Sequence, residues 1–128
     1  MSYYFAKTIT AGFDEAIRRT IEALKKEGFG IITEIDVKDT LKKKINVPFH
    51  DYRILGACNP PLAHEALQIE DKVGTMLPCN VVVQDKGNGT VEVAAIDPVA
   101  SMQAIDNPRL KIAAERGRAK LKAAVEAL

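Results

Sequence analysis

The two cysteines of the chain occur in one short repeated motif, Cys-Asn beside a proline. The first copy is Cys58-Asn59-Pro60 and the second is Pro78-Cys79-Asn80. A thiol at the start of a helix loses its proton more readily, and the resulting thiolate is a nucleophile and a metal ligand. These two motifs are therefore the first candidates for chemistry in this chain.

Strands are expected over residues 52–58 and 79–85, so the first motif ends one strand and the second begins another. A turn at Asn88-Gly89 returns the chain as a third strand over 90–96, which ends beside Asp97. If the first two of these strands run antiparallel, five side chains gather at one end of the sheet. If a right-handed crossover makes the two strands parallel, the cysteines are separated. The five are Cys58, Asn59, Cys79, Asn80 and Asp97, and both arrangements stay open on this reasoning.

In the gathered arrangement, helices starting at Pro60 and Pro98 direct backbone N–H groups to one end of the sheet. Helix starts favour anions and lower the pKa of a nearby thiol. The preferred hypothesis is a small-ligand-binding or thiol-sensing module that uses the five gathered residues. Against an anion, proline removes two donors, and Asn59 and Asp97 have capping roles.

Two other functions remain open. One is a thiol-dependent enzyme that uses Cys58 or Cys79 with His64, which requires the imidazole within hydrogen-bond reach of the sulfur. By helical phase His64 lies on the outward side of its helix, so this contact is conceivable but not indicated. The other is a purely structural or interaction dimer in which both cysteines are buried and inert. The sequence identifies no cofactor.

No metal site is predicted. Two cysteines, even with His64 or His50, lack the closely spaced pairs of structural zinc sites. Gly28-Phe29-Gly30 precedes a strand rather than following one, so it does not fit a dinucleotide-binding fingerprint.

Composition indicates one globular domain over residues 1–128, with 47% hydrophobic and 27% charged residues. The formal net charge of +1 argues against nucleic acid as a partner. The start of the chain does not resemble an export leader, and no stretch is long and apolar enough for a bilayer. We expect a cytoplasmic protein without membrane association, whose cysteines are thiols.

Local patterns predict the remaining elements. Strands are expected over 3–8 and 29–37, and helices from Phe13 to a stop at Gly28, over 37–45, and from positions 60, 98 and 108. Asparagine or aspartate before proline marks the last three starts, and the helix from 98 is expected to continue through Met102 and Ile105. The valine run 81–83 predicts a central strand covered on both faces. Gly56 indicates close packing against the backbone.

The final helix carries one continuous apolar stripe bordered by cations, which we interpret as a solvated margin. Ile112 lies on its outer face and is either a dimer contact or one exposed isoleucine. The stripe consists of Leu110, Ala114, Gly117, Leu121, Ala124, Val125 and Leu128.

Three segments carry a family resemblance: Lys-Glu-Gly-Phe-Gly-Ile-Ile-Thr-Glu-Ile-Asp-Val at 26–37, Leu-Gly-Ala-Cys-Asn-Pro at 55–60, and Leu-Pro-Cys-Asn-Val at 77–81. The chain resembles the bacterial and archaeal Domain of Unknown Function 302 family over nearly all its length. The resemblance implies a two-layer α+β domain with an antiparallel sheet, similar to the TATA-binding-protein-like fold, and a homodimer. It favours the gathered arrangement but implies no reaction, and a fold shared with a DNA-binding protein does not transfer DNA binding.

Overall fold

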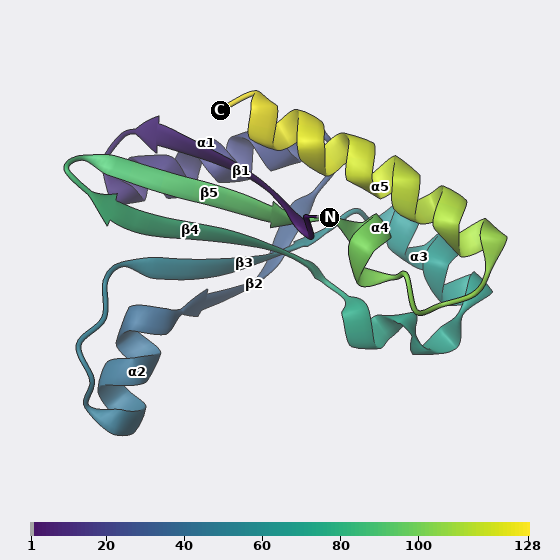
Figure 1. Ribbon diagram of the computed structural model, residues 1–128, viewed down its shortest axis with the longest axis horizontal. Coiled ribbons are helices and arrows are strands. Elements are labelled where there is room, and N and C mark those ends of the chain that lie inside the picture. The colour runs from purple at the N-terminus through teal and green to yellow at the C-terminus, as the bar shows by residue number, and fades with distance from the viewer. Residues whose placement is uncertain (1) are drawn as a thin grey trace.

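A five-stranded antiparallel sheet forms the centre of the computed structural model, which describes residues 2–128 (Figure 1). The strand order is β1-β5-β4-β3-β2, and every neighbouring pair is antiparallel. The strands are β1 Tyr4–Thr10, β2 Gly30–Asp36, β3 Tyr52–Cys58, β4 Cys79–Gly87 and β5 Thr90–Ile96. The predicted antiparallel arrangement is confirmed, and it brings the end of β3 beside the start of β4.

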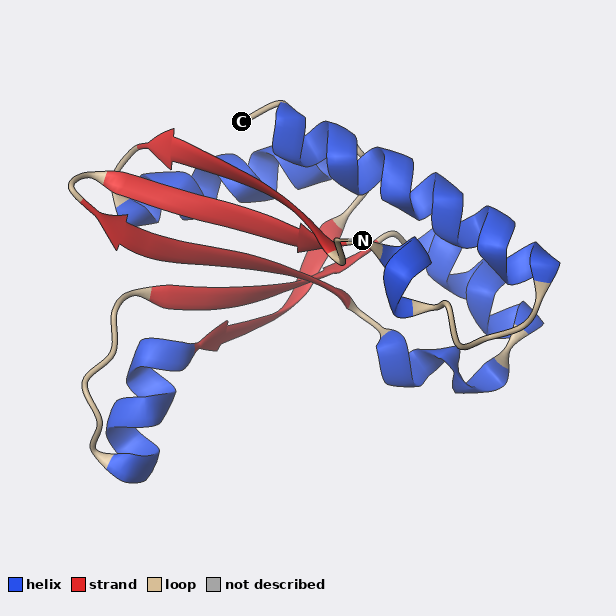
Figure 2. Ribbon diagram, viewed as in Figure 1, coloured by secondary structure: helices blue, strands red, loops and turns tan. Residues whose placement is uncertain are grey.

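The helices complete a two-layer α+β fold, as predicted (Figure 2). Helices α1 and α5 lie over one face of the sheet, and α3, α4 and a short 3-10 helix gather beyond the end of β3. Helix α2 projects beside β2 and β3 toward the opposite end (Figure 1). The helices are α1 Phe13–Lys26, α2 Val37–Ile45, α3 Pro60–Ile69, η1 Asp71–Met76, α4 Pro98–Ser101 and α5 Pro108–Glu126.

Two separate hydrophobic clusters result. The main core lies between the sheet and helices α1 and α5, and includes Leu24, Leu55, Val83 and Leu121. A smaller core lies beyond the sheet, where Ala66, Val73, Met102, Leu110 and Ala114 meet. The candidate site described below lies between these two clusters.

Strand β4 is central but is covered on one face only. Val81 and Val83 are fully buried in the main core. Val82 is half-buried on the other face, in register with Ile54 and Ala94. The prediction of burial on both faces is therefore wrong, because β-branched residues also suit the pleated backbone of a strand that is covered on one side.

The three asparagine or aspartate caps form as predicted. The side chains of Asn59, Asp97 and Asn107 accept hydrogen bonds from the backbone N–H of Leu62 at 3.3 Å, Val99 at 2.9 Å and Arg109 at 3.0 Å. Helix α4 nevertheless ends at Ser101 instead of continuing through Met102 and Ile105. Those two side chains instead enter the smaller core, where their burial favours the turns that follow α4.

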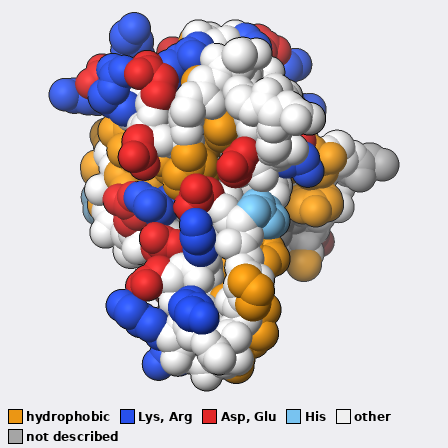
Figure 3. All heavy atoms as spheres, turned by 90° about the vertical axis from the view of Figure 1, so that its left-hand side faces the viewer, with side chains coloured by type: hydrophobic (Ala, Val, Ile, Leu, Met, Phe, Trp, Pro, Cys, Tyr) orange, Lys and Arg blue, Asp and Glu red, His pale blue; other side chains and the backbone are white. Residues whose placement is uncertain are grey.

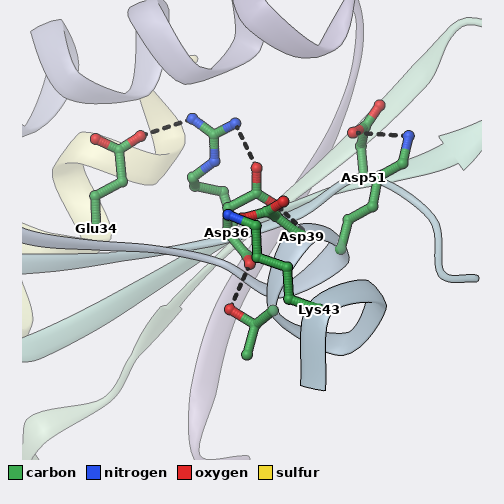
Figure 4. Close-up of polar contacts among 8 residues, drawn as sticks. Glu34, Asp36, Asp39, Lys43 and Asp51 are labelled. Atoms are coloured by element: carbon green, nitrogen blue, oxygen red, sulfur yellow. Dashed lines mark hydrogen bonds and ion pairs between the residues drawn. The ribbon is translucent and has the colours of Figure 1, made fainter. Parts of the chain in front are cut away.

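Ion pairs connect α2 with the neighbouring strands and loop (Figure 4). Arg53 of β3 contacts Asp36, the N-cap residue of α2, at 3.5 Å, and Lys38 of α2 contacts Asp51 in the next loop at 3.5 Å. Figure 3 shows acidic and basic side chains intermixed at this end, beside exposed hydrophobic atoms. Each exposed pair contributes ~0 to 1 kcal/mol to the free energy of unfolding. These contacts therefore orient α2 but add little to stability.

Candidate functional site

The antiparallel pairing of β3 and β4 brings the two Cys-Asn motifs to one end of the sheet. Ala57 lies directly opposite Cys79, so Cys58 is one position beyond that pair. Both cysteines are free thiols and half-buried.

A cavity of about 330 Å³ opens beside these motifs, between the main core and the smaller core. The strand ends contribute Ala57, Cys58, Asn59 and Cys79, and helix α5 contributes Leu110, Ala113, Ala114 and Gly117. The remaining walls come from α3, α4 and the residues around η1 and β2, namely Phe29, Ile32, Leu62, Ala63, Ala66, Leu67, Gly74, Leu77, Pro78, Pro98 and Met102.

Small residues on facing helices create this space. Ala63 and Ala66 of α3 and Ala113 and Ala114 of α5 line the cavity, and Gly117 of α5 faces Pro98 of α4. The alanine side chains are too short to bridge the gap between the helices, whereas the interior of a protein is otherwise closely packed. The sequence of α5 contained this signal, but the contribution of α5 was not predicted, because nothing local shows which helix faces it.

The cavity reaches solvent where its lining is exposed. Ile32 and Leu67 line it and are 62% and 43% exposed, and Gly74 beside Leu67 is also exposed. Leu67 of α3 thus lies at this opening. A small molecule can therefore enter without unfolding the protein.

Cys79 is a neutral thiol at physiological pH. Burial raises the pKa of the Cys79 thiol to about 11, and the neighbouring Cys58 raises it further. The apolar wall of the cavity causes this shift, since it solvates a thiolate poorly. A nucleophilic or redox-reactive Cys79 thiolate, which the helix starts suggested, is not favoured by this environment.

His64 lies outside the cavity. Its side chain is exposed on α3, and its Nε2 atom is 3.3 Å from Nε2 of Gln68, one turn further along. His50 lies in the loop before β3, with Nε2 3.0 Å from Oε1 of Gln84. The proposed pairing of His64 with Cys58 or Cys79 therefore has no supporting contact.

Of the five predicted ligand-binding residues, Cys58, Asn59 and Cys79 line the cavity, but Asn80 and Asp97 do not. Asn80 is exposed and pairs with Gly56 on the uncovered side of the sheet, because successive side chains of a strand alternate between faces.

Asp97 is buried and bonded within the protein. One carboxylate oxygen caps α4, and the other lies 3.4 Å from Nε of Arg118 on α5. The local sequence predicted its cap of α4 but not its contact with Arg118, which lies far along the chain.

The start of α3 offers no free backbone donor for an anion. Pro60 and Pro61 have no N–H group, and the N–H groups of Leu62 and Ala63 bond to the side chain and carbonyl of Asn59. At α4, proline removes the first donor and Asp97 accepts from Val99. Anion binding, one of the sequence-based expectations, therefore has no support at the start of α3.

Within residues 2–128, no three or more histidine, cysteine or acidic side chains are grouped closely enough to hold a metal ion. No helix in the same range combines the length and apolar character that a bilayer span requires.

Comparisons with known proteins agree over almost the whole chain. A family model described as "Domain of unknown function DUF302" matches residues 5–128. The fold is similar to a crystal structure of an uncharacterized conserved protein DUF302 from Bacillus stearothermophilus, with 30% sequence identity and a TM-score of 0.90, over 98% of each chain. No curated protein matches the chain.

Proposed function

Because the chain belongs to the DUF302 family, which is described only as a domain of unknown function, membership brings no reaction with it, and we propose from the cavity that the protein binds a small, largely apolar molecule. The molecule lies between α3, α5 and the adjoining ends of β3 and β4.

The size and chemistry of the cavity support this proposal. Its volume of about 330 Å³ falls at the lower end of small-molecule sites. An engineered leucine-lined cavity of ~150 Å³ binds benzene, so the present cavity has room for a bicyclic ring system or a medium-length alkyl chain. No charged side chain lines it, and its surface is almost wholly hydrocarbon and sulfur.

Binding requires no ionised thiol, unlike the two rival functions that use the cysteines. A thiol-dependent enzyme that uses Cys58 or Cys79 with His64 needs the thiol and the imidazole in contact, and the exposed His64 contacts Gln68 instead. A thiol sensor of the thiolate type needs a lowered pKa, whereas the pKa of Cys79 is raised.

Thermal unfolding with a series of small apolar compounds tests the proposal. We expect benzene, indane or naphthalene to raise the melting temperature, because a ligand at 100 times its Kd stabilises a folded protein by ~2.7 kcal/mol. Failure of every compound in the series to raise it would contradict the proposal.

A cavity-filling variant shows whether the stabilisation arises here. Ala113→Leu adds three carbon atoms to the α5 wall, whereas Ala123→Leu adds them to the exposed face of the same helix. We expect Ala113→Leu to abolish the ligand-induced shift and Ala123→Leu to retain it. If Ala113→Leu melts too low to assay, Ala63→Leu on α3 fills the cavity from the opposite side. If the compounds raise the melting temperature equally in the cavity-filled and control variants, they bind outside the cavity.

A further inference from the structure

The wall of the cavity is exposed over one part and buried over another. Ile32 of β2, Leu67 of α3 and Gly74 of η1 are exposed to solvent, and we call these three residues the rim. The deep wall is buried and comes mainly from α4, the turn after it and α5, namely Pro98, Met102, Leu110, Ala113, Ala114 and Gly117. A molecule in the cavity is therefore enclosed by these helices and reaches water at the rim.

A β-bulge in β2 places Ile32 at the rim. In the pairing of β2 with β3, Ile31 lies opposite Ala57 and Thr33 lies opposite Gly56, so Ile32 between them has no partner. An extra residue of this kind bends its strand and redirects its side chain, and bulges are frequent beside functional sites. The sheet thus presents a large apolar side chain where the cavity meets water.

The buried wall has nothing to pair with a charged head group. Within residues 2–128, no charged side chain lines the cavity, and Asn59 is the only lining residue whose side chain holds nitrogen or oxygen. Its Oδ1 atom already accepts a hydrogen bond from the N–H of Leu62, as the cap of α3. An ion that loses its water against such a wall without a partner is strongly disfavoured. A charged group on the ligand therefore stays at the rim.

Charged residues on the elements of the rim are already paired. Asp71 and Lys72 precede Gly74 on η1, and Nζ of Lys72 lies 3.1 Å from Oδ1 of Asp71. On β2, Oε1 of Glu34 lies 2.7 Å from a guanidinium nitrogen of Arg53. The rim therefore offers water to a head group rather than an unpaired charge of one sign, and it distinguishes little between a cation and an anion.

We infer that the cavity binds single-chain amphiphiles, whose alkyl chain lies against the deep wall while the head group stays in water at the rim. The inference rests on the proposed function and names the chemical class of its ligand. Long lysine and arginine side chains divide in the same way at protein surfaces, with a buried stem and a hydrated head. A cavity of ~150 Å³ holds the six carbons of benzene, so one of about 330 Å³ holds a chain of roughly twelve carbons at most.

Octanol, octanoate and octylammonium test this inference, because they share an alkyl chain and differ in the charge of the head group. Their dissociation constants are measured by calorimetry at neutral pH, below the concentrations at which micelles form. We expect the three values to agree within about fivefold, since each head group keeps its water. In a series of alcohols, each added CH₂ should raise the affinity by about fourfold until the chain fills the cavity.

A charge placed on the rim shows where the head group lies. Ile32→Lys should strengthen octanoate binding and weaken octylammonium binding by about two- to fivefold each at low salt, the range for unit charges ~4 to 8 Å apart in water. Octanol binding should stay unchanged. Ile112→Lys is the matched control, because Ile112 is 59% exposed on α5 and does not line the cavity, whereas Ile32 is 62% exposed. If Ile32→Lys does not fold, Leu67→Lys places the charge on the α3 part of the rim.

Three results would overturn the inference, and they differ in what they mean for the proposed function. If octanoate and octylammonium bind more than about tenfold more weakly than octanol, the head group lies against the apolar wall. If Ile32→Lys changes the binding of the two ions no more than Ile112→Lys does, the head group does not lie at the rim. Binding of octanol and indane would still support the proposed function in both cases. Failure of octanol, indane and naphthalene to bind would overturn both proposals.

Discussion

Cys79 begins strand β4 and lines the cavity, and these surroundings determine the pKa of its thiol. Its side chain lies on the same face as Val81 and Val83 and packs against the main core. The sequence correctly placed the two Cys-Asn motifs at strand ends, but the reactive thiolate that the helix starts suggested does not fit the surroundings of Cys79. Whether a thiol near a helix start meets N–H groups or hydrocarbon depends on side-chain direction and on the packing of α3 and α5.

The raised pKa of Cys79 predicts a pH-dependent contribution to stability. The folded-state pKa of about 11 exceeds the ordinary value of 9.0, so the folded protein holds this proton more tightly than the unfolded chain. The contribution is complete below about pH 9 and is lost as the pH rises toward about 11. We expect the free energy of unfolding to fall less over this interval in Cys79→Ala than in the wild type, measured by urea denaturation.

Two further measurements test whether the burial of Cys79 causes this pH dependence. Cys58→Ala should change the slope less, because burial and not Cys58 is the main cause of the shift. Labelling of the native protein with a thiol reagent should be slow for Cys79 at neutral pH and much faster after unfolding. Rapid labelling of native Cys79 below pH 7 would show that the thiolate is stabilised after all.

At the scale of elements, Gly56 of β3 explains why the neighbouring segments can lie so close to the strand. A Cβ atom at this position would lie 2.0 Å from Oγ1 of Thr33 on β2 and 2.7 Å from Cγ of Pro78 before β4. The prediction that something packs against the backbone at this glycine is thus confirmed, with Thr33 and Pro78 as the neighbours. Glycine at position 56 therefore leaves room for Thr33 and for Pro78, which lines the cavity.

Gly56→Ala is therefore expected to lower the free energy of unfolding by about 1 to 3 kcal/mol, the usual cost of overpacking. Gly30→Ala is the matched control, because Gly30 lies in the paired strand β2 and its added Cβ would contact nothing within 4 Å. The control should change stability by less than ~0.5 kcal/mol. Equal effects in urea denaturation would mean that strand propensity, and not contact with Thr33 and Pro78, determines the loss.

Elements bounded by local signals were predictable. The caps at Asn59, Asp97 and Asn107, the Asn88-Gly89 turn and the strand 52–58 follow from side-chain hydrogen bonds and backbone preferences within a few residues. The cavity was not predictable, since it depends on how α5 packs against α3, with alanines of both helices on the wall. The 3-10 helix η1 also went unpredicted, because a helix of six residues gives too short a pattern to recognise.

At the scale of the whole molecule, several exposed apolar side chains lie together around helix α2. Among residues 2–128, four large exposed hydrophobic residues lie at or near α2, namely Ile35 at the adjoining end of β2, Ile45 on the helix, and Val47 and Phe49 in the next loop. Helix α2 has no buried residue. Concentrated exposed hydrophobic surface is typical of an interaction site. Ile112 on α5, for which the sequence left open a dimer contact or one exposed isoleucine, is exposed between charged neighbours.

The homodimer implied by the family resemblance is a prediction for the intact protein, as are the TATA-binding-protein-like topology and the cytoplasmic location. We expect analytical ultracentrifugation to give twice the chain mass of 14.0 kDa. Ile45→Lys should shift the protein to monomer, because a charge that loses its water at an apolar contact costs several kcal/mol. Ile45 and Ile112 have similar exposures of 62% and 59%, so Ile112→Lys is a matched control that should leave the dimer intact. Dissociation by Ile112→Lys alone would assign the contact to α5, and a wild-type mass of 14.0 kDa would contradict the dimer itself.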